Sequence, residues 1–329
     1  MAVGEASAKE SKSSSYITRL RKGYEKFGII AILIGITVLM SILSDRFLSS
    51  ANIINIIRQV SFIAMIALGS TAIIITKGID LSPGSIVGIT SVVVATYAHP
   101  GQHSLIVVLL IGLGVGTIVG LVNGTLIAKT GIPPFIVTMG MWTTARGLAL
   151  LFSDGRPISN LSPNFIFLGA GDVLGIPVPI IILVVVAILA HLLLNNTRLG
   201  RHIYAVGGNE QAAIISGINV NRVKIFVYAF AGFLASLSAI MLTARIYSGQ
   251  PGLGVGFELD AIAAAVIGGT SLSGGVGTVT GTIAGALVVG VINNGMDLMG
   301  VSMYWQQITK GGIIVLAVFL DMKKHRVKA

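Results

Sequence analysis

The sequence predicts an all-α, polytopic membrane protein with about ten transmembrane helices. The mean hydropathy is +0.91. Of the 329 residues, 54% are hydrophobic and only 10% are charged, a composition that excludes an ordinary soluble domain. The apolar residues form long runs, whereas the strands of a membrane barrel would show short alternating segments. Helices are therefore expected, and the 42 glycines and 9 prolines in and between the runs are compatible with packed or broken membrane helices.

The net charge of +10 does not indicate nucleic-acid binding, because the cations gather at the two chain ends and in one central polar loop. That distribution is typical of a protein oriented in a membrane. The chain has no cysteine, which excludes disulfides, thiolate metal sites and cysteine nucleophiles. The histidines are isolated from one another, so no metal site is predicted.

In chain order, residues 1–26 are polar and basic and are expected to form a cytoplasmic tail. The apolar run 27–43 is not followed by a cleavage site, so it is a retained span. After a second span at 53–75, the polar patch around Asp80 breaks the helix. Pro83 suits the first turn of the next helix, with Ser82 as its cap.

The rest of residues 27–321 continues as one transmembrane domain. A short span precedes a second break near Gly268, and the polar segment 153–175 is expected to be an outer loop. Residues 322–329 form a second basic cytoplasmic tail, and two cytoplasmic ends require an even number of spans. The further spans are expected at 83–98, 105–128, 133–152, 178–194, 225–243, 259–267, 276–292 and 303–320.

An internal repeat relates the two halves of the chain. GTIVG at 116–120 matches GTIAG at 281–285, and Arg146-Gly147 matches Lys310-Gly311. Spans four and five thus match spans nine and ten, and an offset of five spans reverses direction in the membrane. The halves are predicted to be inverted five-helix repeats. Glycines spaced by four should give spans four and nine smooth packing faces: Gly112, Gly116 and Gly120, and Gly277, Gly281 and Gly285.

The longest polar interruption after the N-terminus is the loop 196–224. Asn209 is placed to cap a short helix that begins at Glu210 and stops near Gly217. Two interpretations fit this loop: an ordinary cytoplasmic surface loop, or a docking element for a cytoplasmic partner.

No phosphate-binding GxxxxGK[ST] sequence and no catalytic constellation occurs in the chain. Ionisable residues within the spans are few, chiefly Arg146, Lys310 and Asp297, and such residues are functional candidates. Hydroxyl and amide side chains gather near the broken helices, which suits a path for a neutral, hydroxylated solute. The predicted path residues are Ser82, Ser85, Thr138, Arg146, Thr270, Ser271, Asn293, Asn294 and Lys310.

Five stretches of the chain are distinctive: TKGIDLSPGS (76–85), GIPPFIVTMGM (131–141), TRLGRHIYAVGGNEQAA (197–213), SGINVNRVKI (216–225) and FELDAIAAAVIGGTSLSGGVGT (257–278). Together they resemble the permease subunit of bacterial monosaccharide ABC importers, of the ribose and galactose/methyl-galactoside types. The resemblance covers nearly the whole chain beyond the N-terminal tail. GGTSLSGG looks ribose-like and Tyr304-Trp305-Gln306 looks galactose-like, so the sugar stays open between pentose and hexose.

The resemblance implies a homodimeric permease in the bacterial inner membrane. Its partners would be a cytoplasmic ATPase, with two nucleotide-binding domains often fused in one chain, and an extracytoplasmic sugar-binding protein. ATP and Mg would bind the ATPase, with no cofactor on this chain. The family's docking segment falls on 207–217, with one residue of difference in the spacing between its acid and its glycine. The implied docking residues are Gly207, Gly208, Asn209, Glu210, Ala212, Ala213 and Gly217.

The sequence therefore predicts the membrane path of an ATP-driven monosaccharide importer, not an enzyme. The main alternative is an ion-coupled secondary sugar transporter, which would need no ATPase. A polytopic membrane enzyme is a third alternative that no visible catalytic group supports.

Overall fold

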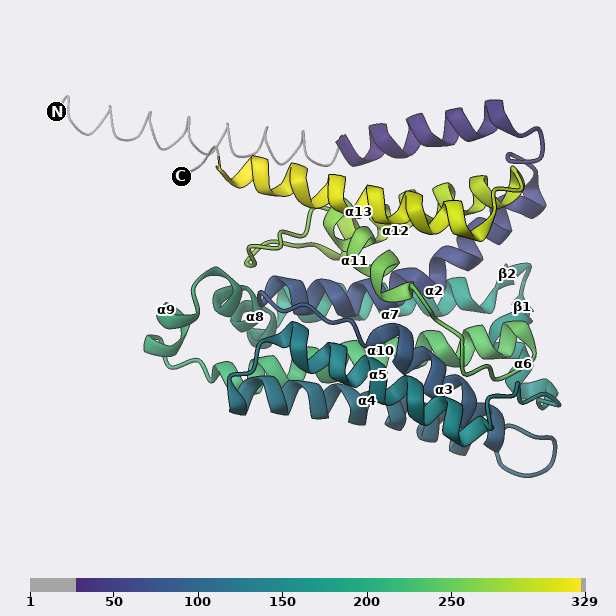
Figure 1. The fold of residues 1–329 in the computed structure, drawn as a ribbon, viewed down its shortest axis with the longest axis horizontal. Coiled ribbons are helices and arrows are strands. Elements are labelled where there is room, and N and C mark those ends of the chain that lie inside the picture. The colour runs from purple at the N-terminus through teal and green to yellow at the C-terminus, as the bar shows by residue number, and fades with distance from the viewer. Residues whose placement is uncertain (1–27, 327–329) are drawn as a thin grey trace.

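The structure, a computed structural model, describes residues 28–326 and is almost entirely helical (Figure 1). The predicted tail 1–26 lies outside the described residues. The elements are helix Gly28–Leu43, α2 Ser50–Ile75, α3 Pro83–Tyr97, α4 Leu105–Thr130, α5 Pro134–Ser153, α6 Pro163–Ala170, β1 Asp172–Val173, β2 Ile176–Pro177, α7 Val178–Asn196, α8 Arg198–Gly208, α9 Glu210–Ile215, α10 Val220–Ile246, α11 Phe257–Ile267, α12 Val279–Leu298 and α13 Met303–Arg326.

A helix stands at each predicted apolar run. Among the described residues, six helices are long and apolar enough to cross a membrane, namely α2, α4, α5, α7, α10 and α12. Gly28–Leu43 and α3 are apolar but shorter, and α11 is a helix of 11 residues. The chain is therefore a multi-pass helical membrane protein. Helix α13 continues through 322–326, the start of the predicted second tail.

The segment 153–175, predicted to be a loop, contains helix α6 and part of a small antiparallel hairpin of β1 and β2. Pro163 lies in the first turn of α6, where its missing N–H costs nothing. Phe165 is completely buried in a cluster with Ile240 and Ala244 of α10. Packing against α10 therefore orders an apolar helix of eight residues, which is too short to be predicted within the polar segment 153–175.

Helix α8 was also missed, because it contains three glycines, Gly200, Gly207 and Gly208, which disfavour a helix prediction. It is amphipathic: Ile203 and Val206 are buried, and Arg201 is exposed. The Thr197 hydroxyl accepts a hydrogen bond from the Gly200 N–H at 3.0 Å and caps the helix. Figure 1 shows α8 and α9 at one end of the bundle and α6 with the hairpin at the other. These are called the α8 end and the hairpin end.

The start of α3 corrects one local prediction. Pro83 does lie in the first turn, but the Ser82 side chain does not cap the helix. The Ser82 hydroxyl instead donates to Asp80 Oδ1 at 2.6 Å, and the Ser82 N–H donates to the same oxygen at 2.8 Å. The Ser82 oxygen, which would accept the hydrogen bond of a cap, instead accepts one from the Asn123 amide at 3.0 Å.

Helices α2 and α10 form the centre of the fold. Most of α2 is buried, and α10 packs against α2, α3, α4 and α6. The packing is reciprocal between the halves of the chain: α10 lies on α3 and α4, whereas α2 lies on α11 and α12. One helix of each half, α2 in the first and α10 in the second, therefore packs against helices of the other half.

The glycine face of α4 is confirmed. Gly112, Gly116 and Gly120 are all buried, and a Cβ at Gly116 would overlap the carbonyl oxygen of Gly232 in α10. In α12, Gly281 and Gly285 face Gly268 and Ala264 in the same manner. Gly277 differs, because it precedes the first residue of α12 and lies against Ile75. Backbone contact, which only glycine permits, holds these helices together.

We expect Gly116→Val to lower the unfolding temperature of the purified protein, because the new side chain must push α10 away from α4. Overpacking of this kind costs about 1–3 kcal/mol. Gly114→Val in the same helix is the matched control, since a Cβ there meets no atom within 4 Å. Equal unfolding temperatures for the two variants would contradict the packing described.

Candidate functional site

The short helix predicted to follow Asn209 is present as α9. The Asn209 side chain accepts a hydrogen bond from the Ala212 N–H at 3.0 Å, which confirms the cap. Gly217 has a φ of 80° just beyond the helix, a conformation that favours glycine. Glu210 pairs with Lys224 at 2.8 Å, which ties α9 to the start of α10. These contacts cap α9 and hold it against the start of α10.

The predicted docking residues divide into two groups. Gly208, Asn209, Ala212 and Gly217 are exposed, and Glu210 is half-buried. Gly207 and Ala213 are buried and face the protein itself. The sequence did not single out Ile214 and Ile215, whose exposed fractions of 49% and 87% leave apolar side chains at the tip of α9.

Gly207 lies against the end of α2. A Cβ at this position would overlap the carbonyl oxygen of Ile75 and approach the nitrogen of Gly275. The same Ile75 oxygen accepts a hydrogen bond from the Gly275 N–H at 2.9 Å. Three segments far apart in the sequence thus meet at one carbonyl group. We call Ile75, Gly207 and Gly275 the junction.

Two side chains strengthen the junction. The Tyr204 hydroxyl donates to the Gly277 carbonyl oxygen at 2.8 Å, and burial raises the pKa of this phenol above its usual value, so it keeps its proton and remains a donor. The Lys77 ammonium lies 3.5 Å from the Gly208 carbonyl oxygen. Helix α8 therefore contacts both broken-helix segments, the one after α2 and the one after α11 (Figure 1).

Ser82 and Thr138, two predicted path residues, belong to one buried polar cluster. The Thr138 hydroxyl accepts from the Leu81 N–H at 3.2 Å, and the Asn123 amide donates to the Ser82 hydroxyl at 3.0 Å. Asp80, which is 4% exposed, holds Ser82 from the other side. Ser85 is adjacent and donates to the Ser82 carbonyl oxygen at 2.8 Å. This cluster fixes the unwound stretch between α2 and α3.

Arg146 joins α5 to the start of α3 and to the loop before α11. Its guanidinium donates to the carbonyl oxygens of Gly84 and Leu253, both at 3.1 Å, and to that of Pro251. The buried carboxylate of Glu258 lies beside the same start of α3, because a Cβ on Gly84 would meet it. Glu258 was not among the predicted residues, although an acid in the first turn of a helix, after a glycine-rich loop, is a recognisable signal.

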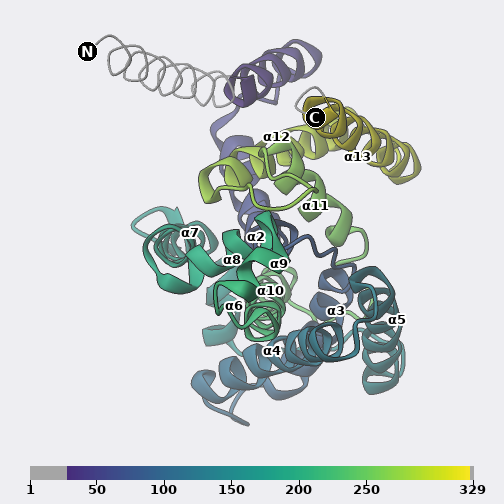
Figure 2. The ribbon, with the colours of Figure 1, turned by 90° about the vertical axis from the view of Figure 1, so that its left-hand side faces the viewer.

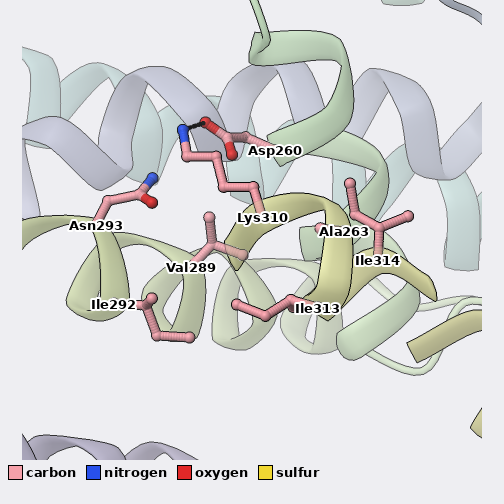
Figure 3. A pocket seen from close by; sticks show the side chains of 8 residues that line it. All are labelled: Asp260, Ala263, Val289, Ile292, Asn293, Lys310, Ile313 and Ile314. Atoms are coloured by element: carbon pink, nitrogen blue, oxygen red, sulfur yellow. Dashed lines mark hydrogen bonds and ion pairs between the residues drawn. The ribbon is translucent and has the colours of Figure 1, made fainter. Parts of the chain in front are cut away.

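Lys310 pairs with Asp260 at 2.9 Å across α13 and α11, and Asn293 of α12 lines the same small pocket (Figure 3). Of the other predicted path residues, Asn294 exchanges two amide hydrogen bonds with Asn52 of α2, both at 2.9 Å. Thr270 and Ser271 are buried in the turn after α11. The structure thus divides the predicted path residues among several separate groups.

Within residues 28–326, no cluster of three or more His, Cys, Asp or Glu side chains is arranged to hold a metal ion. Helices α3 and α11 lie between α5 and α13 on one side of the bundle (Figure 2). Arg146 and Lys310, the predicted repeat partners, reach from these two outer helices toward α3 and α11. Arg146 of the first half and Lys310 of the second half therefore lie on the same side of the bundle, the side of α3 and α11.

Broken helices, buried charges and a folded polar segment between two spans define a membrane transporter of the permease class. The chain belongs to the family described as branched-chain amino acid transport system/permease component, which matches residues 52–318. No solved structure matches the chain.

Curated relatives carry the names of sugar permeases. The chain is 46% identical to the ribose import permease protein RbsC of Bacillus subtilis, over 91% of this chain and 94% of the relative. It is 44% identical to RbsC of Escherichia coli K12, over 92% and 94%. The galactose/methyl galactoside import permease protein MglC of Haemophilus influenzae is 38% identical, over 91% and 94%.

We expect Gly207→Val to break the junction, because its side chain would occupy the space of the Ile75 carbonyl group. Hydrogen exchange of the Gly275 amide should become roughly five- to tenfold faster, since a backbone hydrogen bond contributes about 1 kcal/mol. Gly208→Val is the control, because a Cβ there meets no atom within 4 Å. Unchanged exchange in Gly207→Val would refute the three-way contact.

Proposed function

We propose that the chain is the membrane permease subunit of an ATP-driven importer for a monosaccharide such as ribose or galactose. Family membership, with 46% identity to a ribose import permease, carries this proposal. Identity to the ribose permeases exceeds the 38% identity to the galactose permease, which favours the pentose. The chain has no P-loop sequence, so a partner must hydrolyse ATP.

The assembly we propose contains two copies of this chain, a cytoplasmic ATPase and an extracytoplasmic sugar-binding protein. The ATPase carries ATP and Mg, with its two nucleotide-binding domains fused in one polypeptide. It lies on the cytoplasmic side of the bacterial inner membrane, and the binding protein lies on the other side. These partners follow from the class of transporter, and this chain supplies the path between them.

The α8 end is the cytoplasmic end in this proposal. It carries a strong excess of positive charge, as expected for cytoplasmic loops: Lys77, Lys129, Arg198, Arg201, Arg222 and Lys224. Ten spans then place both chain ends in the cytoplasm, and a helix at each predicted span supports that number. The reciprocal packing of α2 and α10 supports inverted five-helix repeats.

Helix α9 is the proposed docking element for the ATPase. Ile214 and Ile215 are exposed at a polar end of the molecule, outside the apolar band where exposed isoleucines would meet lipid. Apolar side chains of this kind mark protein contacts. The exposed Gly208, Asn209 and Ala212 leave room beside them for a partner surface.

The junction gives this docking element a route to the path. A movement of α9 moves α8, because the two helices pack against each other and the Asn209 N–H, between them, donates to the Ala205 carbonyl oxygen of α8 at 3.0 Å. Helix α8 in turn contacts both interrupted segments, so one displacement reaches the unwound stretches of both halves. The free energy for this movement comes from the ATPase, because nucleotide binds its two conformational states with different affinities.

Reconstituted vesicles test the function directly. Permease, ATPase and binding protein in proteoliposomes should accumulate labelled ribose only when ATP is present on the ATPase side. An ion-coupled secondary transporter, the alternative, would accumulate sugar from an ion gradient with permease alone. Accumulation without ATP or ATPase would overturn the proposal.

Ile215→Glu should reduce copurification of the ATPase and sugar-stimulated ATP hydrolysis by about tenfold, because it places a charge in a desolvated contact. Leu174→Glu is the matched control. Leu174 is 99% exposed at the hairpin, at the opposite end of the bundle. That variant should keep the ATPase bound and weaken only the binding protein. Loss of the ATPase in both variants, or in neither, would count against docking through α9.

A further inference from the structure

Helix α7 presents an apolar face away from the rest of the protein. Val184, Ile188 and Leu189 are 52%, 55% and 60% exposed, and Figure 2 shows α7 at the outer edge of the bundle. The 19 residues of α7 span about 28 Å, close to the roughly 30 Å hydrocarbon thickness of a bilayer. Lipid therefore covers this face, and the two ends of α7 lie near the two boundaries of the hydrocarbon layer.

Polar side chains mark the boundary at the C-terminal end of α7. Leu192, 45% exposed, is the last apolar side chain that points outward. Asn195 and Asn196 after it are exposed, and the Asn195 amide lies 2.9 Å from Nδ1 of the exposed His191. Leu192 and Asn196 are separated by about 6 Å along the helix axis, and a headgroup layer is about 5–8 Å thick. The chain therefore leaves α7 at the level of the lipid headgroups.

Two arginines follow at this level. Arg198 is the first residue of α8 and Arg201 lies one turn later, so their side chains share one face of the helix. Both are exposed, and neither has an ion-pair partner within residues 28–326. Glu210, the next acid in the sequence, is already paired with Lys224. The end of the lipid-covered helix thus carries two positive charges that the described part of the chain leaves unneutralised.

The phosphate of a phospholipid matches this pair in charge and in hydrogen bonding. An arginine side chain offers parallel N–H groups that bind two phosphate oxygens at once. The acyl chains of the same lipid would lie on the apolar face of α7, which is continuous with the arginines along the chain. A zwitterionic headgroup brings its own ammonium group, whereas an anionic lipid is attracted by both arginines. The surface therefore favours a lipid with a net negative charge.

An acidic surface of the ATPase is the other partner to consider. Helix α9, the proposed docking element, begins beyond the far end of α8. The 11 residues of α8 place Arg198 about 15 Å along the axis from that end. Arg222, in the first turn of α10, lies beyond α9 and is also exposed. The arginines at the start of α8 are thus next to the lipid-covered helix and distant from the docking tip.

We propose that Arg198 and Arg201 form a docking surface for the headgroup of an anionic phospholipid in the cytoplasmic leaflet, with its acyl chains along α7. This inference takes the orientation of the chain from the proposed function. The lipid fastens the start of α8 to the membrane, while Gly207 at the other end of α8 contacts the junction. A displacement of α9 then turns α8 about a fixed end, and transport depends on anionic lipid.

Lipid retention by the purified permease, without its partners, tests the docking surface. The protein is equilibrated with equal amounts of phosphatidylglycerol and phosphatidylcholine, washed, and its bound lipids are measured by mass spectrometry. The wild type should retain phosphatidylglycerol in preference. Arg198→Gln and Arg201→Gln should each lower the ratio of the two lipids roughly fivefold. Arg222→Gln, which removes the same charge from an exposed position on α10, is the matched control and should keep the ratio.

Four results would overturn the docking surface. One is a wild-type lipid ratio in both Arg198→Gln and Arg201→Gln, and another is an equal fall in Arg222→Gln, which would indicate only a general effect of charge. Displacement of phosphatidylglycerol by added inorganic phosphate would indicate a site for free anions. Loss of ATPase copurification in Arg198→Gln, with an unchanged lipid ratio, would assign the surface to the ATPase.

A second measurement connects the lipid to transport. Wild-type complexes should take up ribose faster in vesicles that contain phosphatidylglycerol than in phosphatidylcholine alone, and the variant with both Arg198→Gln and Arg201→Gln should lose this difference. Equal lipid dependence in that variant and the wild type would contradict the inference. Absence of ATP-dependent uptake by the wild type in both kinds of vesicle would instead overturn the proposed function, because lipid retention is measured on the permease alone.

Discussion

Ile75 is the last residue of α2, the first long buried helix. The arrangement of the segments around it depends on which group donates a hydrogen bond to its carbonyl oxygen. A break in a membrane helix leaves backbone groups without their helical partners, and other protein groups must replace the missing hydrogen bonds. Gly275, from the break after α11, donates to this oxygen, and Gly207 packs directly against it. The two interruptions thus stabilise each other, and the segment between the halves closes over both.

This arrangement links the ends of the molecule to its polar interior. From the junction, the unwound stretch after α2 leads to Asp80, Ser82 and Thr138. The turn after α11 leads back along that helix to Asp260 and its pairing with Lys310. Arg146 holds the start of α3 to the loop before α11. A displacement at α8 therefore has rigid connections to both groups, which a transporter driven from one end requires.

Sequence predicts the parts of this structure that depend on local chemistry. Long apolar runs predict the helices, Pro83 and Asp80 predict a break, and Asn209 with Gly217 predicts α9. It fails where distant contacts decide: Phe165 orders α6 by packing on α10, and the Ser82 hydroxyl accepts a hydrogen bond from Asn123 of α4 instead of capping α3. The pairing of Asn294, a predicted path residue, with Asn52 of α2 is likewise a contact that no local pattern predicts. The junction joins residues about 70 and 130 positions apart, and no local pattern reveals it.

The central claim is that α8 and the segment 268–278 move as one body when nucleotide binds. The chain has no cysteine, so spin labels can be attached at introduced cysteines without background. Labels at the exposed Arg201 and Ser273 should keep one narrow distance distribution through the ATPase cycle, while the distance from Ser273 to Leu174 changes. A distance between Arg201 and Ser273 that shifts with nucleotide, while Ser273 and Leu174 stay fixed, would contradict coupling through the junction.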